Sequence, residues 1–305
     1  MPRFGRFLAA LVLVLATTSG AEAKDGILLL AHGNHGPSGG AGGHGAPVAA
    51  GHEHHAPPNP WNDNVELVVK AVQAKYPIEV AFGMAEAPSI QAAIARLEKQ
   101  GVTRIAAIPL FVSSHSPIIG NTRYILGLSD SLAKYTSLKT LPRAEMKAKV
   151  AMSPALDAHP LVSEILLDRA RALTKDASKT AVVLIAHGPN AEEENRLWLK
   201  EMAAHAAFIR EKGGFTAVEV LTHRNDASPE IKAKAREEFR ARVLRNGKTS
   251  NVAVVPLLMS AGGIEGQVQG DLDGIPHAFG DPLLPHPNIA KWVETQAQDL
   301  WKGMR

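Results

Sequence analysis

Three histidines that follow apolar runs are the residues of this 305-residue chain best placed to do chemistry. His32 directly follows the apolar run 27–31, His187 directly follows the run 182–186, and His115 comes shortly after the run 105–111. An imidazole can bind Co²⁺, Ni²⁺ or Fe²⁺, and it can accept a proton near neutral pH. A single histidine after a strand is more often a structural residue. The elements around these three must therefore show whether they have a chemical role or a structural one.

The apolar runs alternate with amphipathic stretches along the chain, which predicts an α/β fold. We expect strands at 27–31, 78–82, 105–111, 182–186, 217–221 and 252–259. We expect helices at 65–75, 89–99, 195–211 and 229–245. A βαβαβ order implies a parallel sheet covered by helices on both faces. Ligands of such sheets bind beyond the carboxyl ends of the strands, where His32, His115, His187 and also Glu265 are expected.

The pattern occurs twice, which indicates an internal duplication. "ILLLAHGNH" returns as "VVLIAHGPN", and "AAIPLFVSS" returns as "AVVPLLMSA". We therefore predict two tandem doubly wound parallel-sheet units, at residues 24–178 and 179–305, with an active-site cleft between them. His159 and His286 each precede a proline that would begin the closing helix of a unit, which favours a capping or loop role for both.

The composition limits which classes of partner and which metal ligands are expected. The hydrophobic content of 45% is typical of a globular chain, and the net charge of +3 comes without a basic stripe that carries aromatic residues. Nucleic acid is therefore not an expected partner. The chain has no cysteine, so a metal site must use nitrogen and oxygen ligands. The pattern favours no particular oligomeric state.

The first 23 residues have the pattern of a cleavable secretory signal. Arg3 and Arg6 precede an apolar run at 7–16, and Ala21-Glu22-Ala23, with small residues at its first and third positions, offers a cleavage site. The apolar run is about half of the roughly 20 residues that a membrane-spanning helix needs, and no later run is longer. We expect a periplasmic or secreted protein whose mature chain has no membrane-spanning segment.

An insertion at residues 34–60 interrupts the first unit directly after its first strand. It is rich in glycine and proline and contains five histidines: His35, His44, His52, His54 and His55. Clustered imidazoles bind Ni²⁺, Co²⁺, Cu²⁺ or Zn²⁺ loosely, which suggests an accessory loop that raises the metal concentration beside His32. The alternative is a tolerated linker whose composition carries no function.

Several motifs in the same order resemble the class II chelatase family, the sirohydrochlorin cobalt, nickel and iron chelatases, in its two-repeat form. They are "LLLAHGN", "APSIQAAIARLEKQGVTRIAAIPLFVSSHS", "DAHPLVSEILLDRA" and "LLPHPNIAKWVE". The resemblance extends over nearly the whole mature chain. The resemblance implies insertion of Co²⁺, Ni²⁺ or Fe²⁺, the metal substrate, into a carboxylate-rich tetrapyrrole without an organic cofactor. It implies that His32 and His115 are the metal ligands and proton acceptors.

The chain departs from the family pattern in both repeats. Met84 stands where the family often has a carboxylate, so Glu86 is either a substitute metal ligand or a solvated loop residue. In the second repeat Gly262 stands opposite His115, which predicts no second metal centre, and His187 either contacts the tetrapyrrole or preserves the turn. These departures leave a second hypothesis open, a non-catalytic periplasmic metal or tetrapyrrole binding protein on a chelatase scaffold.

Overall fold

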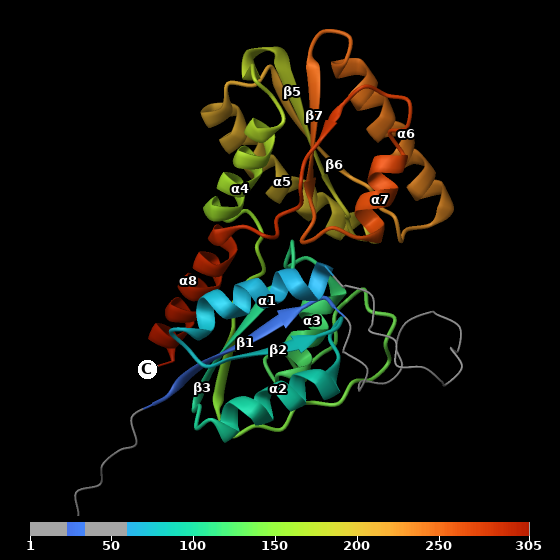
Figure 1. Ribbon diagram of the computed structural model, residues 1–305. Helices are drawn as coiled ribbons and strands as arrows, with labels where there is room; N and C mark the ends of the chain where they lie inside the picture. Colours follow the sequence, from blue (N-terminus) through green and yellow to red (C-terminus); the bar gives the residue numbers. More distant parts are fainter. Residues whose placement is uncertain (1–22, 34–59, 305) are drawn as a thin grey trace, which may run out of the picture.

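Two parallel four-stranded sheets make up the computed structural model, which describes residues 23–33 and 60–304 (Figure 1). The first sheet has the order β2-β1-β3-β4, and the second has the order β6-β5-β7-β8. The strands of the first sheet are β1 (Asp25–Ala31), β2 (Ile78–Phe82), β3 (Arg104–Leu110) and β4 (Lys149–Met152). Those of the second are β5 (Thr180–Ala186), β6 (Ala217–Thr222), β7 (Asn251–Leu257) and β8 (Ala278–Phe279). The matching strand orders confirm the predicted α/β fold of duplicated units.

Seven α-helices connect these strands and an eighth follows the last strand in the described part of the chain. They are α1 (Pro60–Gln73), α2 (Ala87–Lys99), α3 (Pro117–Ile125), α4 (Pro160–Ala172), α5 (Glu192–Gly213), α6 (Pro229–Asn246), α7 (Gly263–Gly270) and α8 (Pro287–Gly303). A short 3₁₀ helix spans Ala177–Lys179. The sequence analysis predicted α1, α2, α5, α6 and six of the described strands, β1, β2, β3, β5, β6 and β7, within a few residues. It did not predict the short elements α3, β4, α7 and β8.

Burial on both faces explains why the inner strands β1, β3, β5 and β7 contain continuous apolar runs. In β1, Ile27 and Leu29 belong to one buried cluster, whereas Leu28 and Leu30 belong to another on the opposite face of the sheet. Helices α1 and α8 cover the first face, and α2 and α3 cover the second. The second sheet is covered by α4 and α5 on one face and by α6 and α7 on the other.

The last helix of each repeat packs against the sheet of the other repeat. Helix α4 contacts α5 and β7, while α8 contacts β3 and α1. Figure 1 shows α8 lying beside α1 and the first sheet, and α4 lying beside the second sheet. One continuous buried cluster therefore runs through α1, α8, α4 and α5. The domain boundary between residues 178 and 179 stays a prediction. The two sides are not separately packed, because α4 packs against the second sheet and α8 against the first.

Two histidines begin these exchanged helices, as the sequence analysis expected. The Nδ1 atom of His159 accepts a hydrogen bond from the backbone N–H of Leu161 at 3.2 Å, and Nδ1 of His286 accepts one from Asn288 at 3.2 Å. Each histidine is the N-cap residue of a helix whose first residue is proline. The predicted capping role is confirmed.

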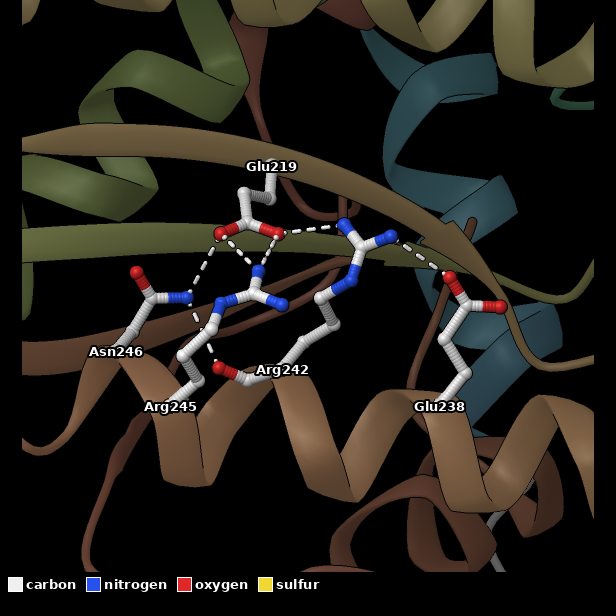
Figure 2. A network of polar contacts seen from close by, with 5 residues as sticks. All are labelled: Glu219, Glu238, Arg242, Arg245 and Asn246. Atoms are coloured by element: carbon white, nitrogen blue, oxygen red, sulfur yellow. Dashed lines mark hydrogen bonds and ion pairs between the residues drawn. The ribbon is translucent and has the colours of Figure 1, made fainter.

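A polar network fixes helix α6 to the edge strand β6 (Figure 2). The carboxylate of Glu219 accepts hydrogen bonds from Arg242 at 2.6 Å, from Arg245 at 2.8 Å and from Asn246 at 2.9 Å. Burial raises the pKa of Glu219, but these hydrogen bonds outweigh it and lower the pKa to about 2. Glu238 contributes one further contact, to Arg242, on the exposed side of the helix.

Two predictions fall on segments outside the described residues. They concern the signal sequence at 1–23, of which only the last residue is described, and the histidines of the insertion, His35, His44, His52, His54 and His55. Among the described helices, none combines the length and the apolar character needed to cross a membrane.

Candidate functional site

The register of the two sheets shows which strand ends correspond. Ala31 of β1 pairs with Leu110 of β3, and Ala186 of β5 pairs with Leu257 of β7. His32 and His115 therefore follow two hydrogen-bonded strands of the first sheet.

The same register relates the two repeats to each other. His187 directly follows β5, as His32 follows β1. Gly262 stands as many residues after β7 as His115 stands after β3. The predicted correspondence between His115 and Gly262 is confirmed.

His32 is an exposed residue that packs against the first turn of α1. Its ring centroid lies 4.8 Å from that of Trp61, with the two planes inclined by 53°. A Cβ atom on Gly33 would come within 2.5 Å of the Phe82 ring and 2.6 Å of the Asn62 side chain, so any other residue after the histidine would displace these side chains. Desolvation and the nearby His187 lower the pKa of His32, which favours the neutral imidazole that binds metal ions.

The loop that carries His115 is held by an aspartate from the loop after β4. The carboxylate of Asp157 accepts a hydrogen bond from the backbone N–H of Ser114 at 2.6 Å and another from its hydroxyl at 2.8 Å. The hydroxyl of Ser113 accepts from the backbone N–H of His115 at 3.1 Å. These bonds fix the backbone on both sides of the histidine.

His115 contacts a carboxylate from the second repeat. Its Nε2 lies 3.1 Å from Oε1 of Glu201 on α5, and the two side chains are 38% and 16% exposed. Burial raises the pKa of Glu201, a hydrogen bond with Ser113 lowers it, and the charge of Asp157 raises it, which gives a value of about 7. The indole N–H of Trp198, one turn earlier on α5, donates to the backbone oxygen of His115 at 2.7 Å.

His187 has an acidic partner within its own repeat. Its Nε2 lies 3.2 Å from Oδ2 of Asp226 in the loop after β6. Burial lowers the pKa of His187, the charge of Asp226 raises it and the neighbouring His223 lowers it, with a downward shift as the result. His223 is buried and its Nε2 lies 2.8 Å from Oδ2 of Asp271.

Glu86 is the counterpart of Asp226 in the first repeat. Phe82 pairs with Ala31 as Thr222 pairs with Ala186, so the two carboxylates stand equally far beyond their strands. Glu86 is the exposed N-cap residue of α2, and its side chain lies over Gly83, where an added Cβ would come within 2.7 Å of it. Met84 is 56% exposed.

The structure brings the predicted residues into two groups. His32 and His187 lie near enough for the charge of one to affect the other, and His115 lies against Glu201. Across residues 23–33 and 60–304, no group of three or more histidine, aspartate or glutamate side chains is arranged to hold a metal ion. A metal bound jointly by His32 and His115, with or without Glu86, stays a prediction. Glu265 caps its own helix by accepting from the backbone N–H of Gly262 at 3.3 Å.

The sequence analysis missed three residues that position His115: Glu201, Trp198 and Asp157. Asp157 begins the quoted motif "DAHP", so its position offered a signal. Glu201 and Trp198 lie on an ordinary amphipathic helix of the other repeat, and only the packing of α5 against the first repeat reveals their role.

Solved structures with a similar fold include several chelatase-like proteins. SirB from Bacillus subtilis with Fe³⁺ matches with a TM-score of 0.62 and 15% identity, over 91% of this chain and 95% of that one. The sirohydrochlorin chelatase SirB from Bacillus subtilis subspecies spizizenii in complex with cobalt matches with a TM-score of 0.59 and 13% identity, over 90% and 94%.

DR2241 from Deinococcus radiodurans, a multi-domain protein with structural similarity to chelatases, matches with a TM-score of 0.55 and 19% identity. The match covers 90% of this chain and 55% of DR2241, which has two additional domains. A comparison with curated proteins gave no match.

The sequence profile of the CbiX family matches the chain twice, at residues 53–173 and 181–300. The two matched segments correspond to the two repeats, and they cover most of the chain. Together with the duplicated fold, they show that this chain is a two-repeat member of the CbiX family, as the resemblance to class II chelatases predicted.

Proposed function

We propose that this protein inserts a divalent metal ion, Co²⁺, Ni²⁺ or Fe²⁺, into a sirohydrochlorin-like tetrapyrrole. The observation that carries the proposal is the placement of His32 and His115 beyond two hydrogen-bonded strands in a chain of the CbiX family. The likeness to SirB, for which structures with Fe³⁺ and with cobalt exist, supports a metal as the substrate.

The two imidazoles are the proposed metal ligands. Neutral imidazole binds Co²⁺, Ni²⁺ and Fe²⁺, and a chain without cysteine offers only nitrogen and oxygen donors. A small number of such ligands captures the ion without enclosing it. The ion can then pass to the four nitrogens of the tetrapyrrole, which a complete protein cage would prevent.

Metal insertion also releases protons from the pyrrole nitrogens. His32 and His115 are the proposed acceptors, because imidazole exchanges protons near neutral pH. We propose His187, which lies near His32, as a contact to the tetrapyrrole. Glu86 is proposed as a further metal ligand, supported by the 3.2 Å contact that its counterpart Asp226 makes with His187.

The segments at 1–23 and 34–60 extend this proposal. We propose that the first is removed on export and that the histidines of the second bind metal ions loosely and supply them to His32. Deleting residues 34–56 should reduce the number of Co²⁺ ions bound per chain and slow turnover only at limiting metal. An equal loss at saturating metal would assign the segment to the active site instead.

Metal insertion by residues 24–305 tests the proposed activity. Sirohydrochlorin would be mixed with Co²⁺, Ni²⁺ or Fe²⁺ and a catalytic amount of protein, and the visible spectrum followed at fixed free metal. We expect acceleration with at least one metal and a fall of at least about tenfold in His32→Ala and in His115→Ala. A wild-type rate equal to the uncatalysed rate would overturn the proposal.

A non-catalytic metal or tetrapyrrole binding protein is the second candidate. One observation favours it: exposed Met84 stands where the family often has a carboxylate. This function predicts stoichiometric binding without turnover. Metallation of many equivalents by one equivalent of protein would rule it out.

A further inference from the structure

Glu201 is a carboxylate from the second repeat that reaches the histidine of the first repeat. We propose that Glu201 is a ligand of the divalent metal ion that His115 binds, so that α5 completes the metal site beyond the first sheet. The inference rests on the proposed function, and it adds a ligand on an element that the sequence analysis did not connect to His115.

The separation of the two side chains fits a shared metal ion. Two ligand atoms about 2.1 Å from one ion lie about 3.0 Å apart when they are adjacent in an octahedral site. In a tetrahedral site they lie about 3.4 Å apart. The observed distance between Nε2 of His115 and Oε1 of Glu201 is 3.1 Å. An ion can therefore contact both atoms after only small movements of the side chains.

Neighbouring contacts hold Glu201 in this position. Trp198, one turn before it, donates to the backbone oxygen of His115 at 2.7 Å. His205, one turn after it, lies with Nε2 2.9 Å from the backbone oxygen of Asp157. Residues 198, 201 and 205 share one face of a helix, so that face is fixed to the His115 loop on both sides of the carboxylate. A ligand held in this way needs little reorganisation to bind.

The charge around Glu201 also favours a cation. Its side chain is 16% exposed, and its contact with His115 is the only ion pair that it makes among the described residues. Removing a carboxylate from water without a cationic partner is unfavourable. A divalent ion bound beside His115 would provide the positive charge.

The internal repeat offers a comparison for this position. Trp61 in α1 corresponds to Trp198 in α5, and the same spacing places Asn64 opposite Glu201. The correspondence is supported by burial, because the helix positions that are buried in α1 recur in α5. These pairs are Val65 and Met202, Val68 and His205, and Val72 and Ile209.

The two repeats differ in a correlated way at this contact. The side-chain amide of Asn64 donates to the hydroxyl of Ser260 at 2.9 Å, and Ser260 corresponds to Ser113, which hydrogen-bonds to Glu201. The loop of Ser260 has Gly262 in place of His115. Helix α5 therefore presents a carboxylate to the loop that contains His115. Helix α1 presents a neutral amide to the loop that contains Gly262.

Co²⁺ titration of the full-length protein, with the ¹⁵N–¹H signal of the Trp198 indole as the probe, tests the inference. That indole donates to the backbone oxygen of His115, so a paramagnetic ion bound at the site would strongly broaden its signal. We expect Glu201→Gln to raise the Co²⁺ concentration for half-broadening at least about tenfold, with an unchanged thermal midpoint. His115→Ala should have a comparable effect, and the matched control Asn64→Asp should have none.

An unchanged titration in Glu201→Gln, with broadening intact in the wild type, would overturn the inference while leaving the proposed function in place. A tenfold weakening in Glu201→Gln in a protein that does not metallate sirohydrochlorin would support the ligand and reject the chelatase activity. The two failures are therefore distinguishable.

Discussion

The buried histidine of α5 should make the stability of the protein depend on pH. His205 is 1% exposed, and it joins α5 to α4 and to the loop of the first repeat. Its Nδ1 lies 2.7 Å from Oγ of Ser163, and its Nε2 lies 2.9 Å from the backbone oxygen of Asp157. A backbone oxygen only accepts, so Nε2 donates, and the neutral ring satisfies both contacts with Nδ1 as the acceptor.

The shift in pKa gives the size of the effect. Burial lowers the pKa of His205, and although contacts with Asp157 oppose this, the value falls from 6.5 to about 4. In the unfolded chain His205 is protonated below about pH 6.5, whereas in the folded protein it is protonated only below about pH 4. The contribution is therefore complete above pH 6.5 and is lost as the pH falls, with a total of about 3 kcal/mol.

The variant His205→Asn removes this titration and isolates it from the other histidines. At pH 7 we expect a lower free energy of unfolding, by about 2 kcal/mol, because buried hydrogen bonds are lost. Between pH 7 and pH 4.5 the wild type should lose about 2.5 kcal/mol more stability than the variant, so the two proteins should be about equally stable at pH 4.5. Urea denaturation followed by circular dichroism at several pH values measures both quantities.

A control for this prediction is Thr222→Val, which removes a buried hydrogen bond from Thr222 to Asn195 that involves no titratable group. Its cost should be the same at pH 7 and pH 4.5. If the difference for His205→Asn also stays constant within about 0.5 kcal/mol, the assignment of a neutral buried imidazole is wrong.

Three further predictions concern stability and the asymmetry of the repeats. Glu219→Gln should lower the free energy of unfolding by about 3 kcal/mol at pH 7, since hydrogen bonds lower the pKa of Glu219 to about 2. This loss should disappear as the pH falls from 4.5 towards 2. As a control, Glu238→Gln at an exposed position should cost less than about 0.5 kcal/mol in the same urea experiments. Trp292→Ala in α8 should cost about 3–5 kcal/mol, measured in the same way, because its fully buried ring covers the sheet of the other repeat, and a loss below about 1 kcal/mol would contradict that packing. His187→Ala should reduce the metallation rate much less than His115→Ala, because the second repeat has Gly262 where the first has His115 and so offers only one histidine. Equal losses with both folds intact would indicate a metal bridged between the repeats.

The inner strands β1, β3, β5 and β7 were predictable because each contains a continuous apolar run, and these runs alternate with amphipathic helices. The repeated "AHG" motif also located the two strand-end histidines, and the structure explains the glycine of its first copy. A side chain at Gly33 would collide with the Phe82 ring. Short peripheral elements such as α7 and β8 have too few residues for a periodic pattern to appear.

Contacts between distant segments were not predictable from one sequence. The exchange of α4 and α8 depends on which sheet each amphipathic helix covers, and both sheets offer a similar apolar face. For the same reason Glu201 gave no signal, because its partner His115 lies in the other repeat. The sequence analysis searched for a replacement carboxylate near Met84, whereas the carboxylate that contacts His115 comes from α5.

The rate at which a catalytic amount of residues 24–305 metallates sirohydrochlorin tests the central proposal most directly. Co²⁺ would be buffered at a fixed free concentration, and product formation followed by visible absorption in the wild type, in His32→Ala and in His115→Ala. We predict many turnovers per wild-type chain and rates at least about tenfold lower in both variants, with unchanged thermal midpoints. A wild-type rate no faster than the protein-free reaction with Co²⁺, and likewise with Ni²⁺ and Fe²⁺, would contradict the proposal that this CbiX-family chain is a chelatase.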